Sequence, residues 1–310
     1  MSATWLELVQ RACDELGLDR PSTLASSTDL QARQLGALAN RQGDALQKQH
    51  GWTMLQNEWI VNVIGPVITT GDSTLGSAVI TNIPDTSGIS AGTYYVNADI
   101  APQAARVASV DSSTQITMTE LATATSTGST FTFSKDTYAI PTDFDRYIGR
   151  TFWDRTNHWE LIGPQSPQFD QWQRSGVVTT GPRRRFRQIG HLYNVFRLWP
   201  PPQAQDAPAT LVFEYISKDW VETSAGVYQS SFTADDDVCV FDDELMVKGI
   251  KWRFYQAKGF DYAALQAEHI DDVNRTIARD GGSAVLDMSR KKFPMFVSPA
   301  NVPDSGFGNP

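Results

Sequence analysis

Apolar side chains recur every three or four positions along the first 60 residues, which is the spacing of a helix that packs on one face. The first such stripe consists of Trp5, Leu8, Val9, Ala12 and Leu16. It stops at Gly17, a residue type that often terminates helices. A second stripe runs from Leu35 to Leu46, and Thr28 with Gln31 has the spacing of a capping box. The pattern therefore predicts two N-terminal helices.

Residues 62–134 change to the two-residue alternation of β-strands. About a third of this segment is serine or threonine, and Arg106 is its one arginine. The predicted strands are 78–83, 93–96, 106–110, 115–121 and 130–133. Short strands at this spacing predict a small sandwich or barrel. Because the flanking stretches are rich in tryptophan and charge, we predict that the segment is an inserted all-β domain.

The rest of the chain adds paired strands, two helices and a tail. Alternating runs at 192–199 and 210–216 flank three prolines, which predicts an antiparallel pair. Asp242–Glu244 is expected to begin a helix that extends to residue 258, and a second helix is expected over about 261–279. The proline-rich residues 283–310 predict an extended C-terminal tail.

Together these elements predict an α+β protein. Its core would be a helical bundle of the two N-terminal and two C-terminal helices, accompanied by antiparallel β elements. In this interpretation residues 1–61 and 135–282 form the core domain, 62–134 the inserted sandwich- or barrel-like domain, and 283–310 the tail.

Charge and composition exclude some classes of protein. Across 310 residues, 26 lysines and arginines face 35 aspartates and glutamates, a net charge of -9 that argues against tight binding of nucleic acid through its phosphates. No apolar run approaches the roughly 18 residues of a membrane span, and the N-terminus lacks an apolar signal core, so we expect a cytosolic start and no membrane partner. Cys13 and Cys239 are expected to be buried thiols.

Two common catalytic or metal-binding motifs are missing: the chain has no His-Glu-x-x-His and no Cys-x-x-Cys. Residues 71–77 match the glycine spacing of a phosphate loop, but Ser77 stands where the lysine is needed, so we interpret them as a turn. The four histidines, at positions 50, 158, 191 and 269, are far apart and are expected to be structural or exposed. We expect no enzyme activity, no cofactor and no metal site.

Three clusters leave alternatives open. Asp235, Asp236 and Asp237 lack the glycine and glutamate of a calcium loop, so they form either a solvated loop before a helix or an acidic surface that repels passing DNA. The basic run of Arg183, Arg184, Arg185 and Arg187 favours a contact with another subunit or a partner protein, or a solvated loop, over contact with DNA. For Trp153, Trp159 and Trp172, core packing is favoured over a sugar-stacking platform.

The order of several short motifs resembles a known family. Gly51-Trp52-Thr53 is followed by residues 138–146, by 196–202, by 213–217 and then by two helices. This order is similar to that of the head-to-tail adaptor proteins of short-tailed bacteriophages, also called tail tubular protein A or tail accessory factor, over residues 1–61 and 135–290. In addition, residues 76–92 and 107–119 resemble a β-module that recurs in phage structural proteins.

The resemblance implies a structural virion protein at the head–tail junction, assembled in the host cytoplasm. About twelve copies would form a ring that joins the portal protein to the tail nozzle or tube and extends the DNA channel, without sequence-specific DNA binding. In that setting Lys291, Lys292, Phe293 and Phe296 are candidates for portal contact, and the three aspartates at 235–237 for the channel wall. The insertion departs from smaller members of the family.

Two other classes of protein compete with the adaptor. One is a different neck or tail component, such as a stopper or nozzle subunit. The other is a carbohydrate-active or carbohydrate-binding protein built on the β segment and the tryptophans, since the paired carboxylates of glycoside hydrolysis require no local motif.

Overall fold

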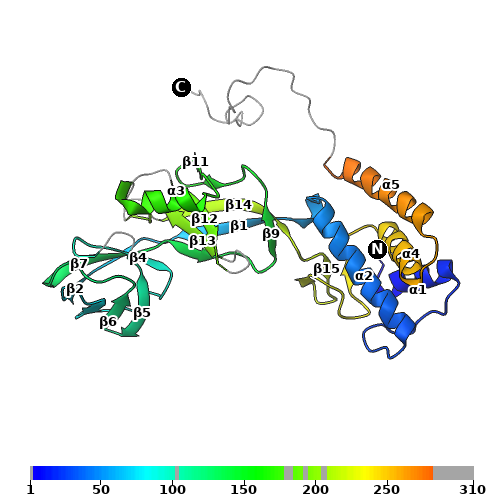
Figure 1. Cartoon of the computed structure of the whole chain (residues 1–310), viewed down its shortest axis with the longest axis horizontal. Helices are drawn as coiled ribbons and strands as arrows, with labels where there is room; N and C mark the ends of the chain where they lie inside the picture. The colour runs from blue at the N-terminus through cyan, green and yellow to red at the C-terminus, as the bar shows by residue number, and fades with distance from the viewer. Residues whose placement is uncertain (1–2, 102–104, 178–183, 191–194, 204–207, 282–310) are drawn as a thin grey trace, which may run out of the picture.

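A computed structural model describes residues 3–101, 105–177, 184–190, 195–203 and 208–281. The molecule is elongated, with helices at one end and β-sheet at the other (Figure 1). Over the described ranges it is a mixed α and β protein with five α-helices, α1 to α5, and several antiparallel sheets.

Four helices share one hydrophobic cluster at the helical end. They are α1 (Trp5–Leu16), α2 (Leu30–Gln49), α4 (Asp243–Lys258) and α5 (Ala263–Asp280), close to the predicted ranges. The cluster contains Leu8 of α1, Leu35 of α2, Ile250 of α4 and Val273 of α5, all nearly or fully buried. The hydrophobic stripes of the sequence therefore converge on a common core, as helical periodicity requires.

The ends of these helices are set by side chains and glycines. Thr4 and Glu7 form a capping box at the start of α1, and Gly17 ends that helix with a φ of 68°. The capping box predicted at Thr28 is wrong. Asp29 caps α2 instead, because its carboxylate accepts hydrogen bonds from the backbone N–H groups of Gln31 and Ala32.

A small sheet closes the helical end. It consists of β15 (Val221–Glu222), β16 (Tyr228–Gln229) and β17 (Val238–Cys239). Trp220, just before β15, is fully buried, and its ring meets Phe232 edge-on at 5.0 Å. The sheet thus supplies aromatic rings to the core that the helices share.

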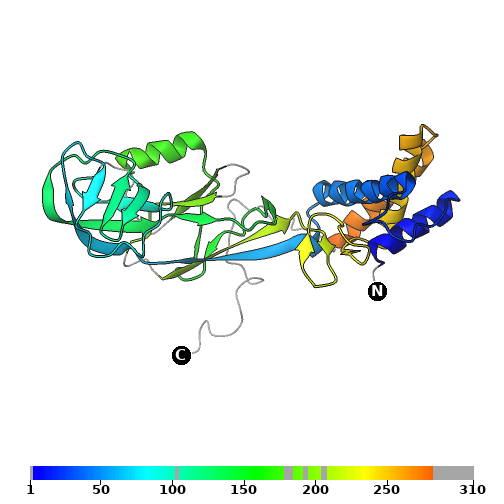
Figure 2. The same ribbon diagram turned by 90° about the horizontal axis from the view of Figure 1, so that it is seen from below.

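Two sheets face each other in the middle of the molecule. The first contains β1 (Gln56–Val63), β14 (Ala209–Ser217), β9 (Phe144–Tyr147), β10 (Trp153–Asp154) and β11 (Trp159–Glu160). The second contains β12 (Arg185–Ile189), β13 (Val195–Trp199) and β8 (Thr137–Ala139). Figure 2 shows β1 and β14, paired over eight residues, running between the two ends of the molecule.

The predicted antiparallel pair of 192–199 with 210–216 is wrong. Residues 192–194 lie outside the described part; β13 pairs with β12 and β8, whereas β14 pairs with β1, β9 and β10. The two runs instead meet face to face, with the rings of Phe196 and Phe213 stacked at 5.8 Å. The intervening prolines do not form a tight hairpin turn, and β14 finds a longer partner in β1.

The strands between Val67 and Lys135 form a closed six-stranded sheet, called the insert below. They are β2 (Val67–Ser73), β3 (Val79–Thr81), β4 (Tyr94–Asn97), β5 (Val107–Ser112), β6 (Gln115–Met118) and β7 (Ser126–Lys135). The order is β4-β7-β2-β3-β6-β5, and a bridge from Tyr95 to Arg106 joins the two edges. Gly71 lies within β2, so only the second glycine of the phosphate-loop spacing, Gly76, lies in a turn.

One further helix lies beside the central sheets. It is α3 (Pro167–Trp172), which Ser166 caps and which continues into a π-helical turn, Gln173–Val177. In Figure 1 this helix lies above β12, near the insert. Its position places Asp170 and Arg174 close to the place where the insert meets the central sheets.

Candidate functional site

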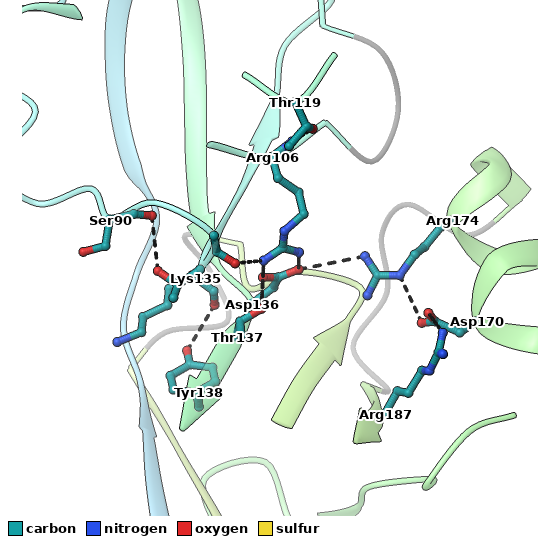
Figure 3. Close-up of polar contacts among 12 residues, drawn as sticks. Ser90, Arg106, Thr119, Lys135, Asp136, Thr137, Tyr138, Asp170, Arg174 and Arg187 are labelled. Carbon is teal, nitrogen blue, oxygen red and sulfur yellow. Dashed lines mark hydrogen bonds and ion pairs between the residues drawn. The ribbon is translucent and has the colours of Figure 1, made fainter. Parts of the chain in front are cut away.

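A buried ion pair joins the insert to the central sheets (Figure 3). Arg106 donates from Nη1 to Oδ2 of Asp136 at 2.6 Å and from Nη2 to Oδ1 at 2.8 Å, a two-point arrangement. The Asp136 side chain is fully buried, and the Arg106 side chain is 12% exposed. Asp136 stands between β7 and β8, the point at which the chain leaves the insert. The lone arginine of residues 62–134 therefore anchors the insert to the body.

A second carboxylate extends this ion pair into a network. Asp170 of α3 accepts a hydrogen bond from Nε of Arg174 at 3.0 Å and one from Nη1 of Arg187 at 2.8 Å. Nη1 of Arg174 lies 3.9 Å from Oδ2 of Asp136, which connects the two carboxylates. We call Arg106, Arg174, Arg187, Arg197, Asp136 and Asp170 the junction cluster.

Aromatic rings enclose the junction cluster. The guanidinium of Arg174 lies over the ring of Trp199 at 4.4 Å, and the edge of Tyr95 in the insert meets the same ring at 5.3 Å. Trp199 is 2% exposed. A cation between a carboxylate and a buried aromatic face is held more strongly than one in water, so this contact ties α3 to the insert.

Arg197 completes the junction cluster from β13. It stands directly opposite Arg187 in the β12–β13 pair. Burial, and secondarily the charge of Arg106, lowers the pKa of Arg197 to about 10. The side chain therefore stays charged at neutral pH, in an environment that disfavours the charge.

The basic run at 183–187 turns inward over the part that the structure describes. Arg184 is 4% exposed and lies 3.8 Å from Asp154, Arg185 lies over the Phe169 ring at 5.1 Å, and Arg187 binds Asp170 as above. Arg183 lies outside the described residues. Arg184 and Arg187 balance internal carboxylates, so the expectation of a solvated basic loop is wrong for these two residues.

The aspartate run at 235–237 also has internal roles. Asp237 is 1% exposed and accepts hydrogen bonds from the backbone of Thr233 and Ala234. Asp235 accepts from the backbone of Leu24 and Ala25, and these bonds, together with one from Thr23, lower its pKa despite partial burial. Asp236 is the exposed member of the three.

Two of the three singled-out tryptophans lie on the surface. Trp159 is 36% exposed and Trp172 is 50% exposed, with Trp172 stacked on Phe169 at 5.4 Å. Core packing, the favoured prediction, is therefore wrong for both. Trp153 is half-buried and lines an open cavity of about 630 Å³ on the outer face of β1, β14 and β10, together with Glu58, Glu214, Arg150, Arg155 and His158.

A family comparison decides the class of this protein. The model of the SU10 adaptor protein family matches residues 3–291, which is nearly the whole chain. This chain belongs to the SU10 adaptor protein family. A comparison with curated proteins finds no match. The resemblance to phage adaptors is thereby confirmed: the protein is a structural adaptor of a phage, and its family is not an enzyme family.

The described histidines and both cysteines of the adaptor lie in its interior, at a helix end or at a loop. His269 is 6% exposed, and its Nε2 lies 3.1 Å from Nε2 of Gln42; His50 lies 3.3 Å from Asp280. His158 is exposed, and His191 lies outside the described ranges. Both cysteines are buried and unpaired, as predicted.

The structure also bears on metal binding, membrane insertion and the predicted tail contacts of the adaptor. Among the described residues, no group of three or more His, Cys, Asp or Glu side chains is placed to hold a metal ion. No helix over the same ranges is long and apolar enough to cross a bilayer. The tail candidates Lys291, Lys292, Phe293 and Phe296 lie outside the described residues.

The junction cluster was not predicted from the sequence. Its carboxylates, Asp136 and Asp170, are isolated acids with no motif around them. The available signal was Arg106, because a single arginine in a serine- and threonine-rich β segment requires a counter-charge if it is buried. Its partner lies 30 residues away, at the exit of the insert.

Proposed function

We propose that this adaptor forms a ring of about twelve copies that joins the portal protein to the tail nozzle or tube and extends the DNA channel of the virion. The observation that carries the proposal is the family match over residues 3–291. The elongated build supports it, because its helical end and its β-sheet end lie far apart and leave room for two partners (Figures 1 and 2).

We assign one role to each of the domains predicted from the sequence. Residues 1–61 and 135–282 form the ring body, and the four-helix bundle contacts the neighbouring subunits. Residues 62–134 decorate the outside of the ring or contact another tail component. The junction cluster supports this division, since it fixes the orientation of the insert on the body.

Charge favours passage of DNA over its capture. The net charge of -9 gives weak repulsion toward phosphates, which is suited to a channel through which a genome slides. Of the acids assigned to the channel wall, Asp236 is exposed, so it is the one that we propose for this role. Arg185 is half-buried and is our candidate for a subunit or partner contact.

The tail provides the experiment that tests portal binding. Lys291, Lys292, Phe293 and Phe296 combine cations and aromatic rings, which suit anchoring in a partner's pocket. Truncation after Arg290 should weaken co-sedimentation with portal rings at least tenfold while leaving the circular dichroism and melting temperature of the protein unchanged. Unchanged co-sedimentation would contradict this assignment of the tail.

The alternative neck or tail components differ from an adaptor in the protein that they bind. A nozzle subunit or a stopper further from the head binds the adaptor ring rather than the portal. Full-length protein that ignores portal rings but binds the adaptor of its own phage would therefore favour the alternative.

A further inference from the structure

We propose that the junction cluster binds a small oxyanion of the size of phosphate, held by Arg174, Arg187 and Arg197. This inference goes beyond the adaptor function and does not depend on the ring or on the portal. It rests on the charges, the hydrogen bonds and the burial of the cluster.

The charges of the junction cluster do not balance. Four guanidinium groups, those of Arg106, Arg174, Arg187 and Arg197, interact with two carboxylates, those of Asp136 and Asp170. Both aspartate side chains are at most 2% exposed. Buried charges in proteins are normally paired, so an excess of positive charge here needs a further anion.

Each oxygen of the two carboxylates already accepts at least one hydrogen bond. Asp136 accepts two bonds from Arg106 and one from the Thr137 hydroxyl. Asp170 accepts one bond on each oxygen, from Arg174 and Arg187. Nη2 of Arg174 and Nε of Arg197 are buried and have no hydrogen-bond partner. The Arg174 side chain is 6% exposed, so solvent does not replace the missing acceptor.

The β12–β13 pair brings like charges together. Arg187 and Arg197 occupy directly opposite positions, where side chains share one face of a sheet. Like charges in this arrangement repel each other unless an anion lies between them. Arg174 approaches the same face through Asp170, which Arg187 also binds.

An oxyanion satisfies these conditions better than water. A water molecule can accept from the unpartnered donors, but it does not neutralise the excess charge. A phosphate ion does both, and guanidinium groups match the geometry of its oxygens. The Arg187 side chain is 19% exposed, so access is narrow. Narrow access favours a small free ion, because the backbone of a nucleic acid would need a wider opening.

The test compares thermal unfolding of the full-length protein in phosphate and in chloride at equal ionic strength and pH 7. With about 10 mM phosphate and a Kd near 1 mM, we expect the melting temperature to rise by about 3 °C. Arg197→Met keeps the packing of the side-chain stem, removes the guanidinium with its N–H donors and its charge, and should abolish the rise. Arg155→Met is the matched control, because Arg155 is half-exposed and pairs with Glu58, which is not part of the junction cluster; it should keep the full rise.

Two results would overturn the proposal. One is equal melting temperatures of the wild-type protein in the two salts. The other is the same phosphate-dependent rise in Arg197→Met as in the wild-type protein, which would place the ion elsewhere. If Arg197→Met does not fold, Arg187→Met takes its place. A phosphorus-31 titration of the wild-type protein then reports binding directly, and absence of line broadening up to about 20 mM phosphate counts against the site.

Discussion

Gly43 of α2 lies directly against the indole ring of Trp220. A Cβ atom at position 43 would fall 2.1 Å from Cη2 of that ring, far inside van der Waals contact. Trp220 is fully buried, and its Nε1 donates to Asp44 at 3.2 Å, so the ring has no room to move away. This contact sets how closely α2 approaches the small sheet at the helical end.

Gly43→Ala should therefore destabilise the protein by about 2 kcal/mol, because overpacking outweighs the roughly 1 kcal/mol that alanine normally gains over glycine in a helix. Urea unfolding monitored by tryptophan fluorescence measures this change. Gly149→Ala is the control, since nothing lies within 4 Å of its Cβ position, and it should be nearly neutral. A Gly43→Ala protein as stable as the wild-type protein would refute the close packing.

The buried Arg106–Asp136 ion pair should contribute more to the free energy of unfolding than an exposed ion pair does. Arg106→Met leaves Asp136 buried without its two-point partner and should cost about 3 kcal/mol of unfolding free energy. Arg155→Met removes the half-exposed pair with Glu58 and should cost less than about 1 kcal/mol. Chemical denaturation of both variants gives the comparison. Equal losses would show that the junction pair is not an anchor.

The lowered pKa of His269 leads us to predict how the free energy of unfolding depends on pH. Burial, reinforced by Arg253, lowers the pKa of His269 to about 4 from an ordinary 6.5. Between pH 6.5 and 4 the unfolded chain binds this proton and the folded chain does not, so stability falls as pH decreases through that window. Above pH 6.5 the group is neutral in both states and contributes no dependence.

His269→Gln should flatten the stability profile between pH 6.5 and 4, while placing a neutral polar side chain where the imidazole contacts Gln42. Urea midpoints at four pH values measure the slope. His158→Gln, a change at an exposed loop position, should follow the wild-type profile. Parallel profiles for His269→Gln and the wild-type protein would show that His269 is not the responsible group.

Local patterns predicted the helices because their information is local. The stripe from Trp5 to Leu16 and the glycines at 17 and 259 set the bounds of α1 and α4 within a residue or two. The predicted strands of the insert each overlap an observed strand for the same reason. Capping was harder to predict, since Thr28 and Asp29 are adjacent residue types that can both cap a helix, and the structure uses Asp29.

Contacts between residues distant in the chain could not be predicted from local sequence patterns. Strand β1 was not predicted, although it provides the eight-residue partner of β14 across some 150 positions of chain. Trp159 and Trp172 have apolar neighbours in the sequence, but those neighbours form the core while the two indoles remain at the surface. Burial of Arg184 and Arg187 likewise depends on Asp154 and Asp170, which only the fold brings to the basic run.

The mass of the complex with the portal tests the central proposal most directly. Native mass spectrometry of the 34.3 kDa protein, alone and mixed with the portal ring of its own phage, gives the number of bound copies. We predict a monomer alone and about one adaptor per portal subunit in the mixture. A protein that stays monomeric beside the portal ring would contradict the proposal.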